Sequence, residues 1–67
     1  MKNRFSTSER RVLRAMYRLS RPATTNEIAR WAEMSWNTAN STLKSLYGRK
    51  VVAHGVRMGT GLWIINR

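Results

Sequence analysis

Three helix-start signals, spaced along the first half of the chain, constrain its fold more than any other feature. A capping box, a hydroxyl residue followed three positions later by glutamate, occurs at Ser6 with Glu9. A second one occurs at Thr24 with Glu27. Ser35 is a third residue of the type that begins helices. The spacing therefore predicts three consecutive helices, over residues 7–20, 25–33 and 36–47.

The chain changes character after Gly48, a residue suited to the left-handed conformation that ends a helix. Two runs rich in β-branched and aromatic residues, 51–57 and 62–66, flank a glycine-bearing turn at 58–61. These runs predict a hairpin. The expected fold is mainly α with a C-terminal β-hairpin, in the order helix, helix, helix, strand, strand. It forms a single domain over residues 6–67, preceded by a mobile basic lead over residues 1–5.

Apolar residues at helical and strand spacing define the expected core. The predicted stripes of the three helices are Val12, Leu13, Ala15, Met16 and Leu19, then Ile28, Trp31 and Ala32, then Ala39, Leu43 and Leu46 with Thr42 beside them. In the second strand, alternation places Trp63 with Ile65 on one face. We expect that face to pack inward and Leu62 to be more exposed.

Charge indicates the kind of partner. Thirteen Lys and Arg residues oppose three Asp and Glu residues, which gives a formal net charge of +10 at pH 7. An excess of this size predicts a polyanionic partner. With no cysteine and one histidine, His54, the chain has too few ligands for a metal centre, and we expect no cofactor. It also lacks an acid, base and nucleophile trio, so we do not expect an enzyme.

The helix predicted over residues 36–47 has a polar face without acidic residues. On a helical wheel, Asn37, Asn40, Ser41 and Lys44 lie together, opposite the apolar stripe. Asn can hydrogen-bond to adenine, Lys can reach guanine or phosphate, and an acid here would repel phosphates. This face therefore favours contact with duplex DNA, although an ordinary solvated helix face has the same composition.

A second pattern is a stripe of arginines along the first predicted helix. Five arginines fall within about 100° of arc, with no carboxylate between them. They are Arg10, Arg11, Arg14, Arg18 and Arg21. Like charges one helical turn apart repel each other, and an anionic partner would relieve the repulsion. The stripe is either a contact for nucleic acid or an acidic protein, or a solvated outer face.

The stretch from Thr24 to Val52 resembles a helix-turn-helix, and with the hairpin the chain resembles a winged helix-turn-helix DNA-binding domain. The anchors of the resemblance are Ile28-Ala29, Met34-Ser35, Thr38-Ala39, Leu43, Leu46 and Val51-Val52. It implies that the third helix enters the major groove and that a wing tip at 57–61 contacts the flanking DNA. The implied DNA-facing residues are Trp36, Asn37, Thr38, Asn40, Ser41 and Lys44. Arg49, Lys50, Arg57 and Thr60 are then placed to contact the backbone.

A narrower resemblance is to winged helices that bind left-handed Z-form nucleic acid. Asn40, Gly59-Thr60 and Leu62-Trp63 match the pattern of that group. Lys44 stands where that group has a tyrosine, and Gly61 replaces two prolines. The surface that reads the Z-form shape is therefore incomplete here.

These patterns together predict a small transcriptional regulator that binds double-stranded DNA. The alternatives are a protein-interaction adaptor and a sequence-blind or Z-form nucleic-acid binder. A homodimer is a further possibility, paired through the first helix or the lead. No apolar run approaches the roughly 18 residues of a membrane span, and we expect no small-molecule ligand. A protein of this size would suit the cytoplasm, as a nucleoid-associated, viral or plasmid-encoded regulator.

Overall fold

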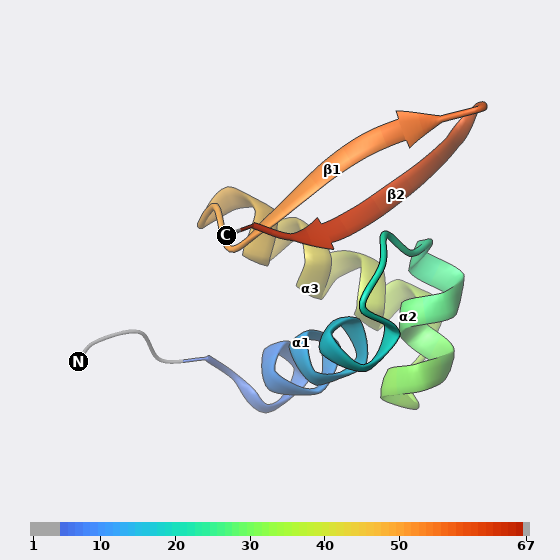
Figure 1. Ribbon diagram of the computed structural model, residues 1–67. Coiled ribbons are helices and arrows are strands. Elements are labelled where there is room, and N and C mark those ends of the chain that lie inside the picture. Colours follow the sequence, from blue (N-terminus) through green and yellow to red (C-terminus); the bar gives the residue numbers. More distant parts are fainter. Residues whose placement is uncertain (1–4, 67) are drawn as a thin grey trace.

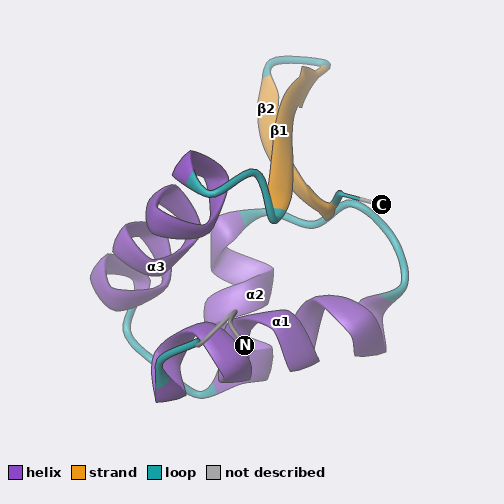
Figure 2. Cartoon of the chain, turned by 90° about the vertical axis from the view of Figure 1, so that its left-hand side faces the viewer, coloured by secondary structure: helices purple, strands orange, loops and turns teal. Residues whose placement is uncertain are grey.

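The computed structural model describes residues 5–66 as three helices followed by a two-stranded antiparallel sheet (Figure 1). The elements are α1 (Thr7–Leu19), α2 (Thr25–Ala32), α3 (Trp36–Gly48), β1 (Val52–Arg57) and β2 (Thr60–Ile65). The three helices pack together, and the hairpin rises from one end of them (Figure 2). The prediction of a mainly α fold with a C-terminal hairpin is confirmed.

Each helix begins at the cap that the sequence predicts. The Ser6 hydroxyl accepts a hydrogen bond from the Glu9 N–H, and the Glu9 carboxylate accepts one from the Ser6 N–H at 2.8 Å. Thr24 and Glu27 form the same reciprocal pair, and Ser35 caps α3 with its hydroxyl. These bonds satisfy backbone donors that a helix start leaves unpaired, which is why the helices begin where they do.

The helix ends differ from the predicted ones. Helices α1 and α2 end one residue earlier than expected because Ser20 and Glu33 take left-handed backbones, with φ of 54° and 57°. After α3, the left-handed position is Lys50, with φ of 64°, and not Gly48, which is the last helical residue. The Val51 N–H then bonds to the Leu46 carbonyl at 2.9 Å, which closes the helix and starts the path into β1.

The hairpin turn is tighter than predicted. Strand β2 begins at Thr60, which pairs with Arg57 across the tip, so the predicted turn over 58–61 contracts to two residues. Those residues, Met58 and Gly59, both have positive φ, at 53° and 79°. Two left-handed residues in succession suit the right-handed twist of a two-residue hairpin loop, which lets pairing extend to the tip.

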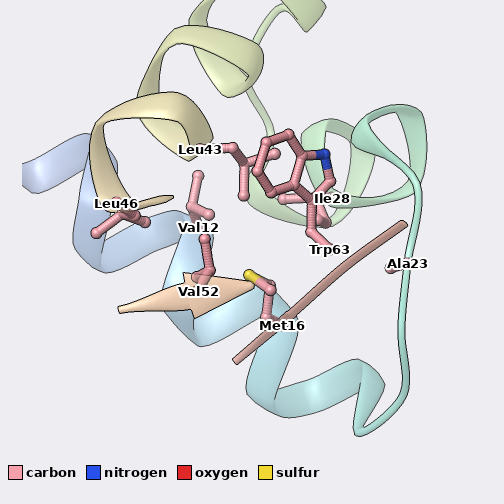
Figure 3. Packing of buried hydrophobic residues seen from close by; sticks show 8 residues of the cluster. All are labelled: Val12, Met16, Ala23, Ile28, Leu43, Leu46, Val52 and Trp63. Carbon is pink, nitrogen blue, oxygen red and sulfur yellow. The ribbon is translucent and has the colours of Figure 1, made fainter. Parts of the chain in front are cut away.

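The core lies where the three helices meet the base of the hairpin (Figure 3). Its buried residues are Val12, Met16, Ala23, Ile28, Leu43, Leu46, Val52 and Trp63. The predicted stripes of α1 and α3 point into it, and Thr42 is buried beside them, with its hydroxyl bonded to the Thr38 carbonyl at 2.7 Å. Burial of each large aliphatic side chain contributes about 1.5–3 kcal/mol.

The predicted face of α2 was partly wrong. Trp31 was expected in the core but is 55% exposed, and Ala29 is buried in its place together with Ile28 and Ala32. The three buried residues span about 100° of the wheel, and Trp31 lies about 60° beyond their edge. A helix of 8 residues contains too few apolar positions to define its inward face from periodicity alone.

The predicted alternation of the second strand is confirmed for its inward face. Trp63 is buried, and Ile65 is partly buried against the core. On the opposite face, Ile64 is the exposed residue, whereas Leu62 is only half-buried. Because Trp63 and Ile65 lie on the same face of β2, that face of the hairpin packs against the helices.

Glu9 is a buried acid that joins α1 to the end of α3. Its carboxylate accepts hydrogen bonds from the Ser45 hydroxyl and from the Arg49 guanidinium, each at 3.3 Å. Arg49 also lies 4.8 Å from the centre of the Phe5 ring, which packs against the core. The backbone hydrogen bond from Ser6 lowers the pKa of Glu9, and Arg49 lowers it further, against the opposing effect of burial. The rest of the predicted lead, residues 1–4, lies outside the described residues.

The lowered pKa of Glu9 predicts a specific acid sensitivity. A carboxyl whose pKa in the folded protein lies below its ordinary value of 4.5 stabilises the fold above that pH, and this contribution is lost as the pH falls through the lowered pKa. We expect Glu9→Gln to be less stable than wild type by about 1 kcal/mol at neutral pH. The difference should shrink as the pH drops below 4.5.

Thermal melts followed by circular dichroism across this pH range measure the effect. Glu33→Gln is the control, because it removes a carboxyl whose side chain is 83% exposed. Parallel stability curves for wild type and Glu9→Gln would contradict the role given to Glu9.

Candidate nucleic-acid interface

An open hollow of about 630 Å³ lies between α3, the start of α2 and the hairpin. Helix α3 contributes Trp36, Asn40, Lys44 and Tyr47. The start of α2 contributes Thr24, Thr25 and Asn26, and the hairpin contributes His54, Thr60, Gly61 and Trp63. None of these residues is acidic. The hollow therefore combines hydrogen-bonding groups, aromatic rings and one cation.

The side of α3 that borders the hollow follows from its burial pattern. Leu43 and Leu46 are fully buried, so the rotation of the helix about its axis is fixed. Trp36, Asn40, Lys44 and Tyr47 recur at three- to four-residue spacing and so lie one above another along a single edge. Trp36 is 48% exposed, Asn40 is half-buried and Lys44 is exposed, which leaves polar atoms accessible along this edge.

Trp63 connects the hairpin to the helices and borders the hollow. Its backbone exchanges two hydrogen bonds with Ala23, at 2.8 and 3.0 Å. Its indole N–H donates to the Thr25 hydroxyl at 2.9 Å. Tyr47 meets the ring edge-on at a centroid distance of 6.2 Å, and His54 lies against it at 4.3 Å. One side chain therefore sets the position of the wing relative to α2 and α3.

None of the three acidic residues lines this hollow. Glu9 is bound between α1 and α3, and Glu27 pairs with Arg21 at 2.7 Å. The Arg21 hydrogen bond lowers the pKa of Glu27, so this carboxyl stays ionised and paired at neutral pH. Glu33 lies beside α1, at 3.9 Å from Arg11. The side chains that line the hollow therefore carry a positive charge, from Lys44, with no negative charge among them.

The hollow gathers some of the residues predicted to contact DNA. Those that line it are Trp36, Asn40, Lys44 and Thr60. Asn37 and Ser41 are exposed on α3 next to this edge, and Arg57 is exposed beside the hairpin tip, paired with Thr60. We call these seven residues the α3–wing surface.

Three other predicted residues lie outside the hollow. Thr38 lies about 160° around the helix from Asn40, and its N–H donates to the Ser35 cap. Arg49 is held by Glu9 on the side of α1. Lys50 occupies the left-handed turn after α3, and its carbonyl accepts a hydrogen bond from the Asn66 side chain at 3.3 Å.

The residues predicted from sequence do not include Tyr47, Asn26 and His54, which also line the hollow. Tyr47 follows Asn40 by seven positions, so the helical wheel carried the signal but was read only for polar residues. Asn26 follows the Thr24 cap, and the N–H groups of a helix start are a known place for anions. His54 is a lone histidine in the sequence, and no local pattern marks it as part of a site. Its place beside Trp63 depends on the hairpin register, which the turn length determines.

Comparisons with known proteins identify the fold. No protein-family model and no curated protein matches the chain. A solved structure of a mutant of Lactococcus lactis ZitR is similar, with a TM-score of 0.81, 14% sequence identity and coverage of 100% of this chain. The chain spans about half the length of that neighbour, 47% of it. Three helices followed by an antiparallel hairpin, superimposable on this neighbour, define a winged-helix fold.

Two further findings hold for residues 5–66. Within this range, no helix has the length and apolar character needed to cross a bilayer. The same residues bring together no group of three or more histidine or carboxylate side chains that could hold a metal ion. The α3–wing surface is the candidate site.

The contact between His54 and Gly61 predicts a local rearrangement. A Cβ added at Gly61 would lie 2.8 Å from the His54 Nε2 atom, so the imidazole must move away. We expect Gly61→Ala to displace His54 from Trp63, and the His54 ring protons to lose the ring-current shift that the indole produces. Nuclear magnetic resonance of the histidine ring measures this shift.

Gly55→Ala is the matched control, because a Cβ at Gly55 meets no atom within 4 Å. It should keep the wild-type His54 shift. An unchanged His54 shift in Gly61→Ala would show that the two groups are not in contact.

Proposed function

We propose that the protein binds double-stranded DNA as a small transcriptional regulator, with α3 in the major groove and the hairpin tip on the flanking backbone. The observation that carries the proposal is the acid-free α3–wing surface, on which Asn40 and Lys44 face a hollow closed by the hairpin. The winged-helix fold supports the proposal, since helix-turn-helix proteins place their second motif helix in the major groove.

The dimensions and chemistry of α3 fit this role. A helix with its side chains is about 10–12 Å wide, and the major groove is about 12 Å wide. The Asn40 amide can donate and accept at the edge of adenine, and Lys44 can reach guanine or a phosphate. Thr25 and Asn26 at the start of α2 line the same hollow and add polar groups to it.

The hairpin tip offers a second contact. Arg57 and Thr60 flank the two-residue turn, so a cation and a hydroxyl project near the end of the wing. Met58 is 97% exposed and Val56 is 72% exposed, which makes the tip apolar as well as cationic. Proteins that contact the minor groove combine arginine with apolar side chains of this kind. The tip therefore suits the sugar-phosphate backbone beside the groove that α3 enters.

Mutations on α3 separate base recognition from phosphate contact. We expect selection on random duplex DNA to recover a motif with wild type, and Asn40→Ala to relax one position of it by about 1–3 kcal/mol. If Lys44 contacts a phosphate, Lys44→Ala should reduce the slope of log affinity against log salt by about 1. Fluorescence anisotropy with labelled duplex at several stated salt concentrations measures both effects.

Arg10→Ala is the control, because it removes one positive charge from α1, away from the hollow. It should leave the recovered motif unchanged. Sequence preference and salt slope that stay at wild-type values in both α3 variants would contradict the proposal. Uniform recovery of sequences by wild type would indicate a sequence-blind protein.

A further inference from the structure

The arginines of α1 border a second hollow, which the proposed duplex site does not use. Arg11, Arg14 and Arg18 line a shallow depression of about 150 Å³ between α1 and the end of α2, together with Trp31. We call these four residues the α1–α2 surface. It shares no lining residue with the hollow at α3. Figure 2 shows α1 on the side of the molecule that lies away from the hairpin tip.

The positive charge of this surface is largely uncompensated. Glu33 also lines the depression, but it lies 3.9 Å from Arg11, and the two side chains are 83% and 52% exposed. An ion pair this open to solvent contributes little. Among residues 5–66, no carboxylate lies within 4.0 Å of Arg14 or Arg18. The three guanidinium groups therefore remain available to an anionic ligand.

The spacing of the arginines suits an extended anionic chain. Positions 11, 14 and 18 lie on one side of α1, separated by about 4.5 and 6 Å along its axis. A guanidinium group can bind a phosphate through two parallel hydrogen bonds, which a lysine cannot do. A row of this kind can therefore follow consecutive phosphates of a single strand.

Trp31 adds a feature that charge alone does not require. The side chain is 55% exposed next to the arginines, at the edge of the buried face of α2. The ring contacts found within residues 5–66 involve Trp63 and not Trp31. An exposed indole beside cations is a platform on which an unpaired base can stack. An acidic peptide would use the cations but would gain little from a flat ring, and the bases of a duplex are not free to stack.

We propose that the α1–α2 surface binds single-stranded nucleic acid. Arg11, Arg14 and Arg18 hold successive phosphates, and Trp31 stacks on one unpaired base. The surface operates independently of the α3–wing surface, because the two lie at opposite ends of α2 and share no residue.

Anisotropy of a fluorescein-labelled oligothymidylate of about ten nucleotides tests the proposal. We expect Trp31→Ala to weaken binding about tenfold, and Trp31→Phe to retain most of the affinity because a ring remains. Arg14→Ala should weaken binding more than Arg10→Ala, which removes the same charge from the same helix but outside the depression. All of these positions are exposed, and thermal melts verify that each variant is folded.

Two further binding measurements distinguish this surface from the proposed duplex site. Asn40→Ala should leave the affinity for the oligothymidylate unchanged. Wild type saturated with duplex DNA should still bind the oligothymidylate. Equal affinity in Trp31→Ala and wild type would overturn the proposal. So would displacement of the oligonucleotide by polyglutamate with the same efficiency in wild type and Trp31→Ala, since that result assigns the surface to acidic proteins.

Discussion

The contact of Trp63 with the helices is the constraint on which the rest of the structure depends. A two-stranded hairpin is marginally stable on its own, so its position must come from packing. Trp63 is only 7% exposed, and it joins the hairpin to Ala23 through the backbone and to Thr25 through the indole N–H. Figure 3 shows its ring beside Leu43 and Ile28 in the core. The same ring borders the candidate interface. The contact that positions the hairpin therefore also shapes the candidate site.

The placement of the few acids shapes the surface as much as the many cations do. Two of the three, Glu9 and Glu27, complete capping boxes and at the same time pair with Arg49 and Arg21. They stabilise helix starts, and each pairs with one cation. Among the residues that the structure describes, Lys44 and Arg57 are exposed on α3 and the wing, and four arginines are exposed on α1. Exposed positive charge is thus present on both of the surfaces that we propose to bind nucleic acid.

Much of the fold could be predicted from sequence because its determinants are local. Capping residues fixed the three helix starts, and long apolar stripes fixed the faces of α1 and α3. The short helix α2 gave a wrong inward position for Trp31, and the left-handed residue after α3 proved to be Lys50, which has no glycine signal. The polar edge of α3 was predictable for the same local reason. The hollow itself was not, because it forms only when Trp63 brings the hairpin to the start of α2.

Amide chemical shifts of isotope-labelled protein, recorded on titration with duplex DNA, test the central claim most directly. The account predicts that the largest changes fall on residues 37–44 of α3 and 57–61 of the hairpin tip, with α1 little affected. Changes concentrated on α1, with residues 37–44 unperturbed at saturation, would contradict it.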